Sequence, residues 1–150
     1  MKPQNRIQWL SDLVRLEIAL WEQVDSRLRR QHNVSLAAFE TIYHTNSAPD
    51  GSLRVGDLAR AVGITVGAAS KLADRVEAAG LIRRQPDADD RRASRIALTQ
   101  SGQDVLSAAT TTYTAELGAL LDSVLTEDEQ KAMHALVKRL LAVAKSENTL

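Results

Sequence analysis

Apolar residues recur at intervals of three, four and seven positions along much of the chain, which is the period of an amphipathic helix. The first such pattern predicts a helix over residues 6–31, with its apolar positions at Ile7, Leu10, Val14, Trp21, Val24 and Leu28. Further apolar residues widen this surface beyond one stripe, namely Leu13, Leu16, Ile18 and Leu20. A helix that is apolar on more than one face packs against more than one neighbour, and we expect this of residues 6–31.

Five further helices are predicted from the same period together with residues that start and stop helices. Their expected ranges are residues 36–46, 55–62, 66–79, 100–123 and 127–146. Hydroxyl oxygens placed to accept the N–H groups of a first turn belong to Ser35, Thr65 and Thr99. Thr126 and Glu129 form a capping box, while Gly63 and Gly80 end the helices before them.

Between residues 80 and 99 the pattern changes from a helical period to two short strands. The runs 81–84 and 94–98 flank a charged loop that contains Pro86 and several aspartates, and residues 53–55 predict one more short strand. Two helices separated by a turn at Gly63 match a helix-turn-helix, and a basic hairpin directly after them is the layout of a winged one. The predicted fold class is therefore mostly α with a small β-hairpin wing.

The helix over residues 66–79 is the candidate recognition helix. A helical wheel directs one side inward, made of Ala69, Leu72, Ala73, Val76 and Ala79. The opposite side carries Gly67, Ser70, Lys71, Asp74 and Ala78, with Arg75 on a flank. Small residues let a backbone approach base edges, and the Ser and Lys side chains hydrogen-bond bases or phosphates. The free N–H groups of the first turn, near Thr65, also suit a phosphate. An ordinary solvated helix has a similar face, so this helix alone does not decide between the two interpretations.

Composition narrows the class of protein. The chain has 150 residues, enough for one domain with a real core, and it has no cysteine, which excludes disulfides, thiol redox sensing and Cys-ligated zinc. It contains no apolar run of about 18 residues that would span a membrane, and its start lacks the apolar core of a secretion signal. We expect a cytoplasmic protein.

Charge is unevenly distributed along a chain whose formal net charge is zero. Residues 54–95 hold nine basic and six acidic side chains, a net of +3, whereas residues 96–150 hold four basic and seven acidic, a net of −3. The predicted helix-turn-helix and wing are thus the electropositive part of the chain, which points towards nucleic acid.

Several short segments, in the right order and at the right separations, resemble the MarR family of bacterial transcriptional regulators. They are residues 53–59, residues 70–77, residues 80–84, the wing-tip segment Asp90-Arg91-Arg92, and Ala97-Leu98-Thr99 followed by Gly102. The last two resemble the D-x-R wing tip and the L-T-x-x-G start of the next helix in that family. The resemblance covers about residues 53–102 and implies one MarR-type domain over residues 1–150, with the winged helix-turn-helix at about 35–98.

The resemblance implies a homodimer that binds double-stranded DNA, with the recognition helix in the major groove and the wing in the adjacent minor groove. Carried over by position, Arg92 is the leading wing contact and Arg91 the next, while Asp90 holds the wing arginines by ion pairing. Arg84 and Arg95 sit at the base of the hairpin, within reach of phosphates. The predicted DNA-binding residues are Thr65, Gly67, Ser70, Lys71, Arg75, Arg84, Arg91 and Arg92. The competing interpretation is a solvated hairpin in which these arginines pair with Asp87, Asp89 or Asp90.

Dimerisation also has a physical argument. The helices at about 6–31 and 100–146 lie outside the DNA-reading segment and carry much aliphatic surface, for example Leu117, Leu120, Leu121, Leu136, Leu140 and Leu141. Pairing them with a second copy would bury that surface and space two recognition helices about one DNA turn apart, so we expect a pseudo-palindromic operator. The alternative is that they pack only within one chain.

Many MarR family members release DNA when a small, often aromatic or anionic molecule enters a cleft between the dimerisation and DNA-binding regions. The candidates for lining such a cleft here are Trp9, Arg15, Trp21, Tyr43 and His44. None of them forms a motif, and an aromatic residue on an apolar stripe is more often core, so both tryptophans are expected in the core.

No pattern in the chain predicts an enzyme, a metal site or a cofactor. His32, His44 and His134 lack metal-ligand spacing, and no serine has the His and Asp pattern of nucleophilic catalysis. The leading hypothesis is a dimeric DNA-binding regulator, most often a repressor in this family. The alternative is a winged-helix protein-interaction module that does not read an operator, which the zero net charge and the outward Asp74 favour.

Overall fold

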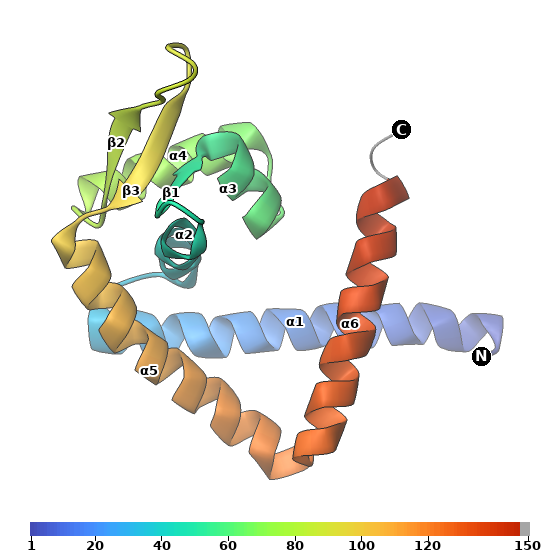
Figure 1. The fold of residues 1–150 in the computed structure, drawn as a ribbon. Coiled ribbons are helices and arrows are strands. Elements are labelled where there is room, and N and C mark those ends of the chain that lie inside the picture. The colour runs from blue at the N-terminus through green and yellow to red at the C-terminus, as the bar shows by residue number, and fades with distance from the viewer. Residues whose placement is uncertain (148–150) are drawn as a thin grey trace. The chain divides into compact units, whose positions relative to one another are not determined.

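The helices and strands follow the predicted order closely (Figure 1). The computed structural model describes residues 1–147, and the side chains of residues 1–144. The elements are α1 (Pro3–His32), α2 (Leu36–Ser47), β1 (Ser52–Arg54), α3 (Val55–Val62), α4 (Val66–Ala78), β2 (Ile82–Pro86), β3 (Ser94–Leu98), α5 (Gln100–Val124) and α6 (Glu127–Glu147). The mostly helical fold with a small sheet confirms the predicted fold class. Residues 148–150 of the predicted domain lie outside the described range.

Helix ends are set by the predicted capping residues. The Ser35 and Thr65 hydroxyls accept the backbone N–H groups of Ala38 and Ala68, at 3.0 and 3.2 Å. The capping box of α6 is also present, because Thr126 N–H donates to the Glu129 carboxylate at 2.8 Å and Glu129 N–H donates to the Thr126 hydroxyl. Gly63 and Gly80 both have a φ of +77°, the left-handed region in which glycine avoids the clash of a Cβ.

The sheet has three antiparallel strands in the order β1-β3-β2. β3 pairs with β2 from Ile82 opposite Leu98 to Pro86 opposite Ser94, and the short β1 pairs with the other edge of β3. Figure 1 shows β2 and β3 leaving the sheet together as a long hairpin, the wing, with α4 beside its base. The predicted strand at 53–55 was one residue late, since the strand covers Ser52–Arg54 and Val55 starts α3.

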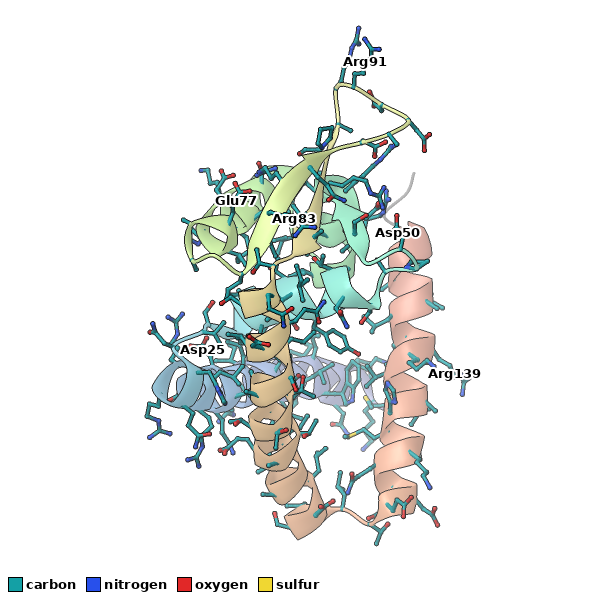
Figure 2. The ribbon with its side chains drawn as sticks, turned by 60° about the vertical axis from the view of Figure 1, so that its left-hand side comes forward. Asp25, Asp50, Glu77, Arg83, Arg91 and Arg139 are labelled. Atoms are coloured by element: carbon teal, nitrogen blue, oxygen red, sulfur yellow. The ribbon has the colours of Figure 1, made fainter. Side chains whose placement is uncertain are left out.

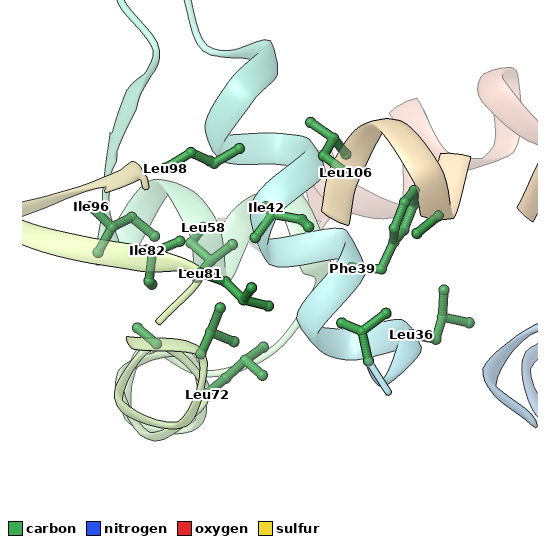
Figure 3. Packing of buried hydrophobic residues seen from close by; sticks show 14 of the residues in the cluster. Leu36, Phe39, Ile42, Leu58, Leu72, Leu81, Ile82, Ile96, Leu98 and Leu106 are labelled. Atoms are coloured by element: carbon green, nitrogen blue, oxygen red, sulfur yellow. The ribbon is translucent and has the colours of Figure 1, made fainter. Parts of the chain in front are cut away.

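A single apolar cluster joins the helix-turn-helix to the wing (Figure 3). Ile42 of α2 and Leu58 of α3 are fully buried at its centre, and Leu106 of α5 closes one side. The predicted anchors of the hairpin are all buried, namely Leu81, Ile82, Ile96 and Leu98. Fully burying a side chain of this size stabilises the fold by roughly 1.5–3 kcal/mol, so the hairpin base is held firmly.

α5 begins against the residues that link α4 to β2. The Thr99 hydroxyl donates to the Gly80 carbonyl and accepts the N–H of Gly102 at 3.0 Å, and Thr99 N–H donates to the Leu81 carbonyl. A Cβ on Gly102 would overlap that Leu81 carbonyl oxygen. Glycine at this position is therefore required by the close approach of α5 to the start of the hairpin.

Three predictions about buried positions were wrong. Trp9 and Trp21 on α1 are 45% and 37% exposed rather than core residues, because the part of α1 before Val24 extends beyond the apolar cluster. Ala79 is exposed as well, since α4 ends at Ala78 and the chain turns there.

The chain divides into two compact units, residues 1–114 and 115–150. The first contains α1 to α4, the sheet and the first part of α5; the second contains the rest of α5 and α6. Within the part of the chain that the structure describes, no helix combines the length and apolar character needed to cross a bilayer.

Candidate nucleic-acid interface

The outer face of α4 is small and polar at its beginning, as the helical wheel predicts. Thr65 caps the helix, and Gly67 and Lys71 are exposed, while Ser70 is half-buried. The inward face is confirmed for Ala69, Leu72, Ala73 and Val76, which are at most 4% exposed. The helix is thus fixed to the core on one side and offers an open surface on the other.

The loop at the tip of the wing is shaped by two aspartates. The Asp87 carboxylate accepts the backbone N–H groups of Asp89 and Asp90, at 2.9 and 3.1 Å. The Asp90 carboxylate accepts the N–H of Arg92 at 2.9 Å, and the Asp90 carbonyl accepts the N–H of Ala93. These bonds hold a turn in which Arg91 and Arg92 occupy the outermost positions.

Asp87 also joins the wing to the rest of the sheet. Its carboxylate accepts a hydrogen bond from Arg54 Nε at 2.7 Å and lies 3.5 Å from Arg95 Nη1, while its side chain is only 2% exposed. The Arg54 guanidinium, with the N–H of Asp89, holds the pKa of the Asp87 carboxyl well below its usual range. The carboxylate therefore stays charged and paired through the whole neutral range.

Arg95 extends this cluster to the far edge of the sheet. Its Nε donates to the Ser52 hydroxyl and its Nη2 to the Ser52 carbonyl, both at 2.8 Å. The same Nη2 lies 3.3 Å from the Asp50 carboxylate. Arg54, Arg95 and Asp87 thus form a clamp that ties β1, β3 and the wing tip together.

Arg84 connects the wing to α4. Its Nη2 donates to the Asp74 carboxylate at 2.5 Å, and its backbone N–H donates to the Glu77 carboxylate at 2.7 Å. The guanidinium also donates to the Ser94 hydroxyl on the neighbouring strand, at 3.2 Å. This residue therefore sets the position of the wing relative to the recognition helix, a role that the expected phosphate contact did not include.

Arg91 and Arg92 differ from these paired arginines. Both side chains are exposed, and within the described residues neither guanidinium has a hydrogen bond or an ion pair. Figure 2 shows Arg91 at the far end of the hairpin, pointing away from the body of the protein. The wing thus presents two unpaired cations on a rigid support.

Two findings at the wing differ from the sequence interpretation. Asp90 orients the tip through the backbone of Arg92, because across the described residues no ion pair joins it to a wing arginine. The main organiser is Asp87, which the sequence interpretation gave as a turn residue and, in the competing interpretation, as one possible partner of the hairpin arginines; Arg95 does pair with it. Its position at the end of a strand, two residues before Asp89, was the available signal, since Asp commonly accepts the N–H groups two and three residues on.

The five candidates for an effector cleft are not brought together. Tyr43 and His44 line a cavity of about 350 Å³ between α2 and α5. Trp21 lines a different cavity, of about 490 Å³, that also reaches Arg75 on α4. Trp9 and Arg15 line neither of these two cavities.

The geometry defines a class of protein. Two short helices, α3 and α4, are separated by a tight turn, and an antiparallel hairpin follows the second one and is fixed to it by Arg84. This arrangement is a winged helix-turn-helix. Residues 32–93, which include the winged helix-turn-helix, match the family model described as "MarR family", and this match confirms the resemblance. The match is to a family of transcriptional regulators, which agrees with the expectation that the chain is not an enzyme.

The fold of almost the entire chain is shared with solved MarR family structures. Sco3205 of Streptomyces coelicolor, a MarR family transcriptional regulator in complex with DNA, matches with a TM-score of 0.83 and 21% identity, covering 94% of this chain and 88% of that one. A mutant MarR from E. coli complexed with operator DNA matches with a TM-score of 0.80 and 21% identity over 94% and 99% of the two chains. MepR of S. aureus, also solved with DNA, matches with a TM-score of 0.73 and 23% identity, covering 95% of this chain and 98% of that one.

Proposed function

We propose that the protein is a homodimeric regulator that binds double-stranded DNA at a pseudo-palindromic operator. The observation that carries the proposal is the wing, on which Arg91 and Arg92 are exposed and unpaired while Arg54, Arg84 and Arg95 are held in ion pairs. Unpaired cations on a projecting hairpin suit a phosphate backbone or a narrow minor groove. The complexes of Sco3205, MarR and MepR with DNA support the same function.

In this proposal the two parts of the interface contact DNA differently. Gly67, Ser70 and Lys71 on the open face of α4 approach base edges in the major groove, and Arg75 on its flank contacts a phosphate. The first turn of α4, capped by Thr65, directs its free N–H groups at another phosphate. The wing arginines then occupy the adjacent minor groove, and Arg84 supports both parts from between them.

The proposed dimer is supported by apolar surface that one chain leaves exposed. On α6, Leu136, Leu140 and Leu141 are each more than half exposed, and on α1 Ile7 and Leu10 are exposed to a similar or greater extent. Exposed apolar patches of this kind mark association surfaces. A symmetric pair of chains presents two recognition helices to two half-sites.

We further propose that the regulator is a repressor that a small molecule releases from DNA. The cavity lined by Tyr43 and His44 is the effector site in this proposal, because α2, which forms one wall, packs against both α3 and α4 through the central cluster. A ligand that shifts α2 would therefore act on α4 through direct packing contacts.

The alternative of an interaction module without DNA binding loses part of its support. Asp74 on the outer face of α4 was an acidic group that would repel phosphates. Its carboxylate is paired with Arg84, so the charge that it presents to a partner is largely balanced.

The experiment that tests the function is a gel-shift titration of the protein against the DNA upstream of its own gene, at several salt concentrations. We expect a sequence-preferring complex whose affinity falls steeply as salt rises, because bound phosphates release counterions. Equal affinity for scrambled DNA, or no complex at low salt, would overturn the proposal in favour of the interaction module.

A further inference from the structure

The cavity between α2 and α5 has an aromatic lining that contains one acidic side chain. Three aromatic rings surround it, with the Phe39 and Tyr113 rings stacked at 5.1 Å and the Phe39 and Tyr43 rings at 6.2 Å between centroids. The other lining residues are Glu40, His44, Thr110 and Thr114. The cavity is thus an aromatic pocket with a small number of polar groups, at the small end of the range for ligand sites.

Glu40 is the one acidic group of this lining, and no basic side chain accompanies it. The structure records no hydrogen bond or ion pair of the Glu40 carboxylate with any other described residue. Burial raises the pKa of Glu40, which means that folding withdraws its carboxylate from water without supplying a protein partner. A partly desolvated, unpaired carboxylate opposes folding, so its retention in a pocket suggests a ligand as its partner.

The other titratable groups of the pocket do not cancel this charge. Burial lowers the pKa of His44, so this imidazole is neutral at physiological pH. Burial, with the nearby charges of Glu40 and Tyr43, raises the pKa of Tyr113, which stays protonated. Among the residues that line the pocket, Glu40 is therefore the group that supplies negative charge.

We propose that this pocket binds a small aromatic cation, a molecule with an aromatic ring and a protonated amine or quaternary ammonium group. The Phe39 ring is buried and stacked against the other two, so the rings of Tyr43 and Tyr113 are the ones that attract a cation through their quadrupoles and stack against an aromatic ring. The Glu40 carboxylate supplies the ion pair. The regulatory effect of such a ligand rests on the proposed function, whereas its binding does not.

An anionic aromatic ligand, which the family resemblance favours, does not suit this lining. A benzoate-like molecule would place its carboxylate beside Glu40 with no cation to compensate, and like charges in a partly desolvated site repel. The proposed ligand is therefore aromatic, as the resemblance implies, and cationic rather than anionic.

The test measures the binding of three matched probes to the full chain by isothermal titration calorimetry. The probes are benzyltrimethylammonium, benzyl alcohol and benzoate, which share the ring and differ in charge. We expect the cation to bind at least about tenfold more tightly than benzoate, a difference of ~1.4 kcal/mol. Benzoate binding as tightly as the cation, or no saturable binding of the cation, would overturn the proposal.

A pair of variants separates the pocket carboxylate from a general charge effect. Glu40→Gln should reduce cation affinity about tenfold, ~1.4 kcal/mol, and leave benzyl alcohol unchanged. Glu17→Gln, on the exposed surface of α1, removes the same charge and should change neither. An equal loss of cation affinity in both variants, or no loss of cation affinity in Glu40→Gln, contradicts the assignment.

The pH dependence gives a second readout with an unambiguous sign. Benzyltrimethylammonium does not titrate, so any change in its affinity comes from the protein. Because the pKa of Glu40 is raised, affinity should begin to fall at a pH above the ordinary glutamate range as the carboxylate is protonated. In Glu40→Gln the remaining dependence should come from His44, whose protonation also repels the cation.

Two further measurements keep the outcomes distinct. Thermal unfolding of Glu40→Gln should be unchanged or occur at higher temperature, since the variant removes a desolvated charge; a large destabilisation would mean that Glu40 has a structural role and would overturn the inference. Gel shifts with the wild-type chain report the proposed function independently. DNA binding without cation selectivity refutes only the ligand, and cation selectivity without DNA binding refutes only the function.

Discussion

Five arginines at the wing and its base fall into two groups by their partners. Arg54, Arg84 and Arg95 are engaged with carboxylates and hydroxyls, whereas Arg91 and Arg92 project from the wing tip unpaired. A paired guanidinium must give up its partner to bind a phosphate, and an exposed one only gives up water. The first group therefore builds the wing, and in the proposed function the second group contacts DNA.

Replacing Arg92 with alanine should weaken operator binding by roughly 1–3 kcal/mol and reduce the salt slope by about one, because a groove contact and its counterion release are lost. Fluorescence anisotropy with a labelled operator at several salt concentrations measures both quantities. Arg139→Ala, an exposed arginine on α6, is the control with the same change in charge. If the two variants bind alike, the wing tip takes no part in recognition.

Replacing Asp87 with asparagine should loosen the wing, because Arg54 and Arg95 lose the carboxylate that pairs with them. We expect a lower unfolding temperature and weaker operator binding, with Asp89→Asn as the exposed control. The pKa of Asp87 is lowered by folding, so its contribution is fully present at neutral pH and is lost only as acid pH falls below the usual aspartate range. A wild-type protein whose difference from Asp87→Asn already disappears near neutral pH would contradict this assignment.

For single residues, the sequence predicts which side chains are exposed better than it predicts which side chains form ion pairs. Arg91 and Arg92 follow a turn-forming aspartate run, so their exposure could be anticipated from the residues alone. Which aspartate organises the tip could not, because Asp87 acts through Arg54 and Arg95, and Arg54 is far along the chain on another strand. Ion pairs of this kind depend on the register of the sheet.

Among the elements, α5 starts in close contact with the backbone at the base of the wing, and this contact leaves no room for a side chain. Gly102 in its first turn lies against the Leu81 carbonyl, which also accepts the Thr99 N–H. The carbonyl therefore has little freedom to move aside for a side chain. The residues near Thr99 were enough to predict the cap. The close approach at Gly102 depends on how α5 packs against the start of the hairpin, which helix propensity alone does not predict.

Replacing Gly102 with alanine should destabilise the fold by about 1–3 kcal/mol, since the new methyl group overlaps a fixed backbone oxygen. The matched control is Gly118→Ala later in α5, where the nearest atom to an added Cβ is 3.9 Å away. That change should stabilise the helix by about 0.5–1 kcal/mol, the usual gain of alanine over glycine. Thermal and urea unfolding compare the two, and effects of the same sign would contradict the clash.

At the scale of the whole molecule, apolar residues of α1 and α6 are exposed in a single chain, which the proposed dimer would cover. The sequence placed Trp9 and Trp21 in the core because amphipathic periodicity identifies a face that is buried without saying what buries it. Both residues are substantially exposed in one chain. The helices themselves, their order and their caps could be predicted, because these depend on residues close together in sequence.

Replacing Leu136 and Leu140 together with glutamine should shift the protein from dimer to monomer, because an exposed apolar face of α6 becomes polar. Sedimentation velocity measures the change in mass, and operator affinity should fall with it since one chain reads one half-site. Lys138→Gln on the same helix is the control and should remain dimeric. A double variant that stays dimeric would place the interface elsewhere.

The clamp of Arg54, Asp87 and Arg95 also has a thermodynamic consequence. Because these ion pairs form in the free protein, the base of the wing loses its conformational entropy on folding and not on DNA binding. Ordering a mobile side chain on binding costs about 0.5–1.5 kcal/mol, and at the wing this cost concerns Arg91 and Arg92 and not the strands that hold them. The wing should therefore dock as a rigid body, with a small heat-capacity change from this part of the interface.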